Sequence, residues 1–177
     1  HDTYFLKAER DGRIVGVLPL GHVRSFLFGN ALTSLPFAVY GGVLADDEDA
    51  ALALEAEAQR LSKELGVQHL ELRGLEARHP EWPRQDLYVT FRKAILPEEE
   101  ANMLAIPRKQ RAMVRKGIKN GLRSEIDRNA DRFFSLYADN MHRHGTTALP
   151  KRYFEALLQE FGPDCEVLTV TGPDGRL

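Results

Sequence analysis

Residues 5–18 read FLKAERDGRIVGVL, two runs with apolar side chains on either side of Asp11-Gly12. Asp-Gly between such runs is a strong hairpin signal, because glycine accepts the positive φ that a tight turn requires. The stretch predicts antiparallel strands at 3–9 and 13–20. Residues 167–176, VLTVTGPDGR, predict a second hairpin with a similar Asp-Gly-Arg core. The two hairpins are consistent with an internal repeat, although turn chemistry alone leaves coincidence open.

The chain between the two hairpins mixes strand and helix patterns. Further strands are predicted at 35–43, 67–73, 86–95, 122–126 and 166–171. Helices are predicted at 48–65, at 97–121 with a break at Pro107, at 130–144 and at 150–161. Four carboxylates at 46–49 favour a helix start through the helix dipole, and Gly66 is typical of a helix end. This alternation indicates an α/β (α+β) fold rather than a helical bundle.

Composition favours a soluble globular chain. The 177 residues are 43% hydrophobic and 28% charged, with a formal net charge of -2. No apolar stretch approaches the ~20 residues of a membrane helix, and no secretory leader is visible, so a cytoplasmic location is expected. A single cysteine excludes an intramolecular disulfide framework. The chain starts without methionine and stops just past a turn signal, so truncation at both ends is expected.

The most unusual segment is basic. Residues 108–123 contain seven cationic side chains and no carboxylate: Arg108, Lys109, Arg111, Arg115, Lys116, Lys119 and Arg123. On a helix, Arg108, Arg111, Arg115 and Lys119 would share one face. A ligand with several phosphates would offset the repulsion between these charges. The alternative is a solvated face, or one that pairs with the carboxylates of 98–100.

Other chemical motifs are weak. His142 and His144 could bind a metal only with further ligands, and none lies nearby at a recognised spacing, so no metal site is predicted. The sequence has no nucleophile elbow, Walker loop or dinucleotide-binding glycine pattern. Gly117 and Gly121 do not form the pyrophosphate loop of acyl-CoA acetyltransferases.

The run 106–122, IPRKQRAMVRKGIKNGL, resembles the basic helix and following strand of FemAB-type aminoacyl and peptidyl transferases. Residues 133–137, 141–146 and 153–157 extend the resemblance, which is densest over 100–177 and thinner over 1–95. It is most similar to the branch associated with exosortase and PEP-CTERM exopolysaccharide systems.

The resemblance implies two tandem GNAT-like repeats, each with a mixed, mostly antiparallel sheet flanked by helices. Residues 1–105 would be the C-terminal part of the first repeat, 106–121 a basic connecting helix, and 122–177 the N-terminal part of the second repeat. Each repeat would begin with the order strand, helix, helix, strand, hairpin.

The resemblance also implies an acyltransferase. It would move an aminoacyl or acyl group from aminoacyl-tRNA or acyl-CoA to an amine of a cell-wall or exopolysaccharide precursor, with no bound cofactor. The implied substrate-binding residues are Arg108, Lys109, Arg111, Arg115, Lys119, Arg143 and Thr146. His142 or His144 would accept the proton, although a structural role for these histidines stays open. The alternative function is a non-catalytic GNAT-like module that binds an anionic polysaccharide, RNA or a partner protein.

Overall fold

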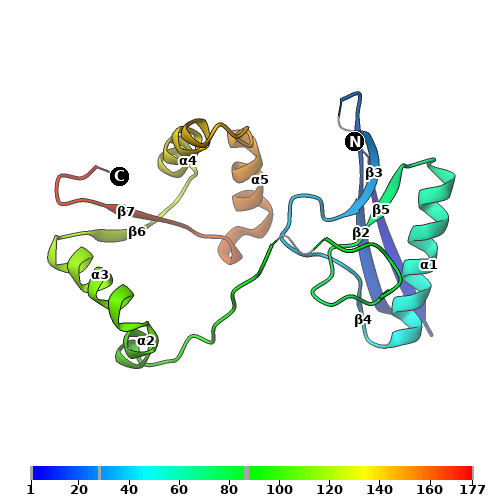
Figure 1. The fold of residues 1–177 in the computed structure, drawn as a ribbon, viewed down its shortest axis with the longest axis horizontal. Helices are drawn as coiled ribbons and strands as arrows, with labels where there is room; N and C mark the ends of the chain where they lie inside the picture. Colours follow the sequence, from blue (N-terminus) through cyan, green and yellow to red (C-terminus); the bar gives the residue numbers. More distant parts are fainter. Residues whose placement is uncertain (1, 28, 86–87, 177) are drawn as a thin grey trace. The chain divides into compact units, whose positions relative to one another are not determined.

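The computed structural model describes residues 2–27, 29–85 and 88–176. The chain forms two compact units, residues 1–90 and 91–177, which are described separately below (Figure 1). The described part contains five α-helices and sheets that are mostly antiparallel, which confirms a mixed α+β fold. No helix of this part is both long and apolar enough to cross a bilayer.

The first unit is built on a twisted sheet with the strand order β1-β2-β3-β5. These strands are β1 (Asp2–Arg10), β2 (Arg13–Ser25), β3 (Gly29–Ser34) and β5 (His69–Glu71), and the short β4 (Leu44–Ala45) also pairs with β2. The β3–β5 pair is parallel and the other pairs are antiparallel. Asp11 and Gly12 both have positive φ, 51° and 76°, so the predicted tight hairpin is confirmed.

Helix α1 (Glu48–Glu64) packs on this sheet and closes the main core. Leu18, Leu20 and Leu32 of the sheet meet Leu54, Ala58 and Leu61 of the helix. Asp47 caps the first turn, because its Oδ1 accepts a hydrogen bond from the Ala50 N–H at 2.9 Å. Gly66, with φ of 60°, follows the last turn. The helix predicted at 48–65 is therefore confirmed.

The strand predicted at 35–43 is wrong. Leu35 has a φ of 40° and Pro36 has no N–H to donate, so the chain leaves the sheet there and the strand lies at 29–34 instead. The Arg73 guanidinium holds the turning segment in place, because its Nη1 donates to the Pro36 carbonyl at 2.6 Å and to the Ala38 carbonyl at 3.1 Å.

The strand predicted at 86–95 is also not present where it can be checked. Asp86 and Leu87 lie outside the described residues, and 88–95 form no strand. Tyr88 and Phe91 are 91% and 92% exposed. A sequence pattern typical of a strand does not form one without a neighbouring strand to accept its hydrogen bonds.

The second unit alternates helices and strands. Its elements are α2 (Glu99–Ala105), α3 (Arg108–Lys119), β6 (Arg123–Asp127), α4 (Asp131–His144), α5 (Lys151–Phe161), the 3-10 turn η1 (Gly162–Asp164) and β7 (Val167–Thr171). Strands β6 and β7 pair antiparallel, with Glu125 opposite Thr169. After β7, Gly172 N–H donates to the Arg176 carbonyl at 2.8 Å across a turn. The order strand, helix, helix, strand matches the prediction for 122–177, but in the described residues up to 176 the predicted second hairpin is a turn without a returning strand. The tandem GNAT repeat stays a prediction.

The second unit buries few of its side chains. Phe133, Tyr137 and Phe154 form an aromatic cluster between α4 and α5, with Phe133 and Phe154 edge-to-face at 4.9 Å. Within the described part of this unit, Ala130, Thr169 and Thr171 are the buried residues. The apolar side chains on the other face of the β6–β7 ribbon are about half exposed, namely Ile126, Leu168 and Val170.

Candidate functional site

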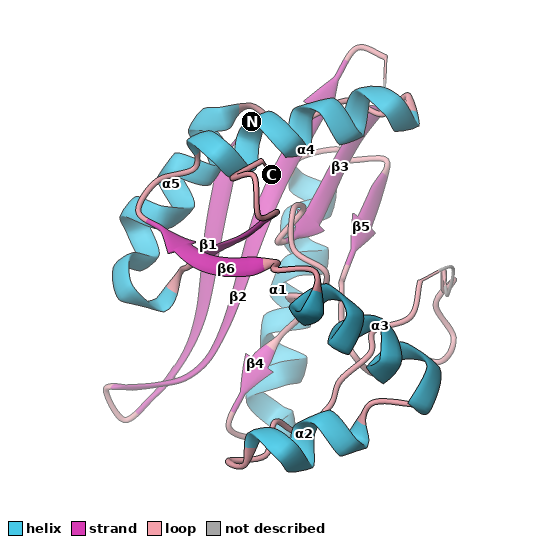
Figure 2. Cartoon of the chain, turned by 90° about the vertical axis from the view of Figure 1, so that its left-hand side faces the viewer, coloured by secondary structure: helices cyan, strands magenta, loops and turns pink. Residues whose placement is uncertain are grey.

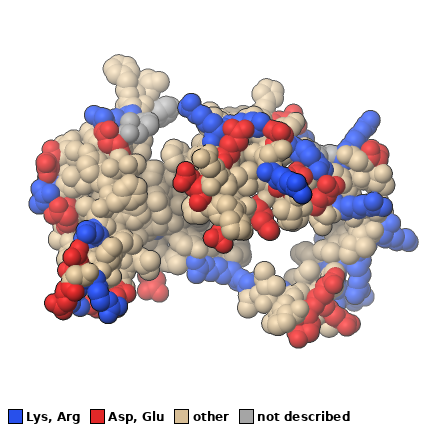
Figure 3. All heavy atoms as spheres, turned by 180° about the vertical axis from the view of Figure 1, so that it is seen from behind, with Lys and Arg blue, Asp and Glu red and all other residues tan. Residues whose placement is uncertain are grey.

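Helices α2 and α3 form a bent pair that carries the basic segment (Figure 2). The bend lies at Ile106-Pro107, where proline starts a new helix but cannot continue the previous one. Six of the twelve residues of α3 are Lys or Arg and none is acidic. Figure 3 shows basic side chains gathered over this region, next to the acidic side chains of α2.

Arg108, Arg115 and Lys119, here called the cation row, lie on one face of α3 by their spacing of seven and four residues. Their side chains are exposed and make no ion pair or hydrogen bond with any residue in the described part of the chain. Pairing with the carboxylates of 98–100 does not occur among these residues, whereas the exposure of the row is also what the solvated-face alternative predicts. The row therefore presents uncompensated positive charge to solvent.

Lys109 and Lys116 are also exposed, at the edge of the row. Arg111 differs from its neighbours because its guanidinium is already bound. Its Nε donates to the Ile106 carbonyl at 3.2 Å, and its Nη2 donates to the carbonyls of Leu104 and Ile106, each at 3.1 Å. The structure thus joins Arg111 to the end of α2, although the sequence grouped it with the cation row.

His142, Arg143, His144 and Thr146 lie together at the C-terminal end of α4, which closes with Gly145 at a φ of 67°. Both histidines are exposed, and neither imidazole has a partner among the residues that the structure describes. The Arg143 Nε lies 3.3 Å from the Asp139 carboxylate. Thr146 donates weakly to the Met141 carbonyl at 3.4 Å.

The loop after α4 is held by Tyr137, whose hydroxyl accepts a hydrogen bond from the Leu149 N–H at 3.0 Å. Tyr137 itself packs against Phe133 and Phe154, so the loop is fixed to the aromatic cluster between α4 and α5. No hydrogen bond or ion pair between described residues joins this loop to the cation row. The predicted site residues therefore form two groups, one on α3 and one at the end of α4.

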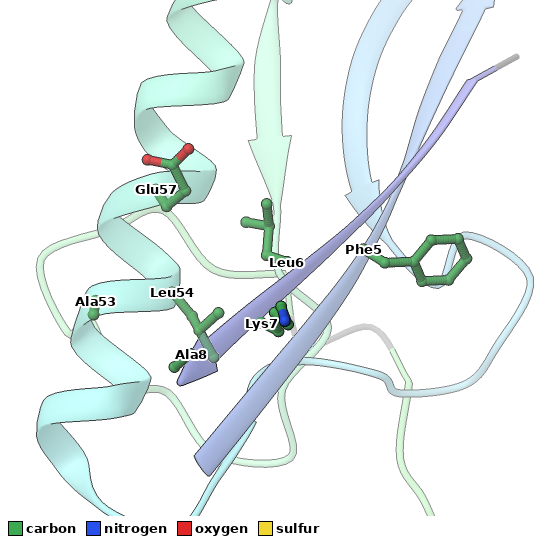
Figure 4. A pocket seen from close by; sticks show the side chains of 7 residues that line it. All are labelled: Phe5, Leu6, Lys7, Ala8, Ala53, Leu54 and Glu57. Carbon is green, nitrogen blue, oxygen red and sulfur yellow. The ribbon is translucent and has the colours of Figure 1, made fainter. Parts of the chain in front are cut away.

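Two cavities are lined by other residues. One, of about 370 Å³, lies between β1 and α1 and is lined by Leu6, Ala8 and Leu54 among others; Figure 4 shows Phe5 pointing away from the helix. The other, of about 230 Å³, lies between α4, α5 and β7, beside Phe133 and Cys165. Neither cavity is lined by a predicted site residue, so they add no substrate pocket to the prediction.

A charged cluster that sequence reasoning missed lies in the first unit. Glu55 on α1 is only 2% exposed, and its carboxylate accepts from Arg78 Nε at 2.8 Å and contacts His79 Nε2 at 3.0 Å. Hydrogen bonds to Glu48, and then to Glu55, raise the pKa of Arg78. His79 also stacks on Trp82, with ring centroids 4.3 Å apart.

The cluster ties the loop around residues 78–82 to α1. A sequence signal for it existed, because Glu55 follows Leu54 on the helix face that also carries Ala58 and Leu61. A carboxylate on such a face needs a cation or several donors. The sequence did not say which cation, since Arg78 is 23 residues away.

Among the described residues, no group of three or more His, Cys, Asp or Glu side chains could hold a metal ion. A scan against protein-family models and a comparison with curated proteins found no match to this chain.

Proposed function

We propose that this chain belongs to an acyltransferase of the FemAB type. It transfers an aminoacyl or acyl group, delivered by aminoacyl-tRNA or acyl-CoA, to an amine of a cell-wall or exopolysaccharide precursor. The observation that carries the proposal is the cation row of Arg108, Arg115 and Lys119, exposed and unpaired with any described residue. The resemblance over 106–122 supplies the class of reaction.

Phosphates are the ligand chemistry that such a row fits. Arginine binds phosphate oxygens through charge-assisted, often bidentate hydrogen bonds, and lysine adds a point charge. Both proposed donors and a nucleotide-linked acceptor carry several phosphates. Binding them along α3 would offset the repulsion between like charges three or four residues apart.

Beyond substrate binding, the reaction needs few catalytic groups from the protein. The donor ester or thioester is already activated, so holding donor and amine together supplies a large part of the rate. The attacking amine must first lose a proton. His142 or His144 is the proposed acceptor, and Arg143 and Thr146 are the proposed contacts of the acceptor substrate.

A non-catalytic module that binds an anionic partner is the second candidate. The observation that favours it is the exposure of both histidines, neither of which has an orienting partner among the described residues. Catalytic histidines are usually fixed by a second hydrogen bond. This candidate keeps the cation row but has no group transfer.

The test compares the full chain with Arg115→Glu/Lys119→Glu and with a charge-reversed control, Arg13→Glu, at an exposed position of the first unit. The affinities of the protein for deacylated tRNA and for acyl-CoA are measured first. We expect at least one of these two affinities to fall about 10-fold or more in the double variant and neither to fall in the control. Unchanged binding in the double variant contradicts the anion site.

A donor screen then separates the two candidates. Labelled aminoacyl-tRNA and acyl-CoA are each incubated with an amine-bearing wall or exopolysaccharide precursor. Transfer by the unaltered chain that the double variant loses supports the enzyme. Binding without transfer from either donor favours the binding module.

A further inference from the structure

Arg111 is bound to the end of the preceding helix, which sets it apart from the other cations of α3. The last carbonyls of an α-helix have no partner within that helix, and basic side chains can satisfy them. Arg111 does so for α2: its three hydrogen bonds to the Leu104 and Ile106 carbonyls, at 3.1–3.2 Å, are called the Arg111 bridge. The side chain is half-buried, unlike those of the cation row.

The bridge needs an arginine. Nε and Nη2 point in nearly the same direction from one rigid plane, so they reach two carbonyls at once. A lysine ammonium is a single point on a flexible stem and cannot span both carbonyls in this geometry. Substitution by lysine therefore keeps the charge but removes the bridge.

The chain before α2 is tied to the middle of the helix. Asn102 accepts from the Leu96 N–H at 2.8 Å and donates to the Leu96 carbonyl at 2.5 Å. Helix α2 has seven residues and is about 10 Å long. Glu99 and Glu100 lie in the first turn of α2, at the far end from the bend.

We propose that Arg111 is a positioning residue and does not bind the phosphates itself. It sets the angle between α2 and α3, keeps the cation row open to a polyphosphorylated ligand, and prevents the α2 carboxylates from pairing with that row. This inference rests on the proposed anion site, and it removes one of the residues that the sequence assigned to it.

The experiment measures binding of inorganic polyphosphate to the full chain over a range of salt concentrations. The slope of log affinity against log salt counts the phosphates that the protein neutralises, so it falls by roughly one for each phosphate that a variant no longer neutralises. Arg115→Gln, a change in the row, should lower the slope by roughly one. Arg111→Gln and Arg111→Lys should both weaken binding about 5-fold or more with the slope unchanged.

Hydrogen exchange of the amides at 104–112 provides an independent readout. It should quicken in both Arg111 variants and stay unchanged in Arg115→Gln and in the control Arg13→Gln in the first unit, while circular dichroism shows that all variants are folded. A slope that falls in Arg111→Gln and is restored in Arg111→Lys overturns the inference, because Arg111 then contacts phosphate. Unchanged exchange in the Arg111 variants overturns it too.

Failure of the proposed anion site gives a different result from failure of the proposed role of Arg111. If the unaltered chain binds no polyphosphate, acyl-CoA or tRNA, the anion site is wrong, and with it the role of Arg111 in ligand binding. Exchange at 104–112 still decides whether Arg111 holds the two helices together. The two failures are therefore distinguishable in one set of variants.

Discussion

At the scale of single residues, Asp47 performs two tasks with one carboxylate. It caps α1 through the Ala50 N–H, and it binds the Arg10 guanidinium with N–O distances of 2.6 and 3.2 Å. The ion pair with Arg10 needs the charged form, and the charge also strengthens the helix cap. The hydrogen bond from Arg10 first, and then the backbone N–H of Ala50, lower the pKa of Asp47 from its usual value of 3.8.

This lowered pKa predicts the direction in which the stability contributed by Asp47 changes with pH. A carboxyl with a depressed pKa in the folded state stabilises that state above its unfolded pKa, and the stabilisation is lost as the pH falls through the folded pKa. Asp47→Asn, which keeps a capping oxygen, should therefore be less stable than the unaltered chain at pH 7. The difference should shrink as the pH falls below about 4. Urea unfolding at pH 7, 4 and 2.5 checks this, and a difference that is constant with pH contradicts it.

At the scale of elements, α1 is the organising piece of the first unit. It closes the core with one face and holds the loop around residues 78–82 through Glu55. A buried carboxylate of this kind favours the loop conformation that supplies its donors, because a buried charge without donors costs stability. The short α2 is held in an analogous way: Asn102 in its middle bonds to Leu96 before the helix, and Arg111 bonds to its C-terminal end.

Removing the buried carboxylate should cost stability. Glu55→Gln keeps the shape but loses the charge that Arg78 and His79 contact, and we expect the free energy of unfolding to fall by about 1–3 kcal/mol. Exchange of amides in the loop at 74–83 should quicken at the same time. The matched control is Glu57→Gln, a partly exposed position on the same helix whose carboxylate pairs with Arg60 at the surface, and this change should have little effect. Equal effects of the two changes would show that the buried cluster does not hold the loop.

At the scale of the whole molecule, the two units differ in how much they bury. The first has a multi-stranded sheet under a 17-residue helix, with leucines that are nearly inaccessible. The second has a two-stranded ribbon, and isolated ribbons are marginally stable in water. Buried apolar area is the main favourable term in folding, so the units should differ in stability.

The difference is measurable by hydrogen exchange on the full chain. Amides of β2, β3 and α1 should exchange slowly, and those of β6 and β7 at least 100-fold faster, because local opening costs less where little apolar surface is buried. Thermal unfolding should then show two transitions rather than one. Uniform protection across both units, with a single transition, would mean that they unfold together.

Local chemistry let the sequence predict several elements well. The Asp11-Gly12 turn, the start of α1 near the 46–49 carboxylates, the break at Pro107 and the helices at 130–144 and 150–161 follow from turn, cap and proline rules that act over a few residues. The strand predicted at 35–43 failed because pairing decides strands, and Leu35-Pro36 turns that segment out of the sheet.

By itself, the sequence determined the order of most elements and the cation row on one face of α3, since both depend on spacing along the chain. Only the tertiary structure decided which charged side chains bind partners within the chain. Glu55 meets Arg78 across 23 residues, and Arg111 turns back to the carbonyls of α2. Side-chain partners are selected by three-dimensional packing and by the cost of leaving polar groups unpaired, and neither can be read from spacing.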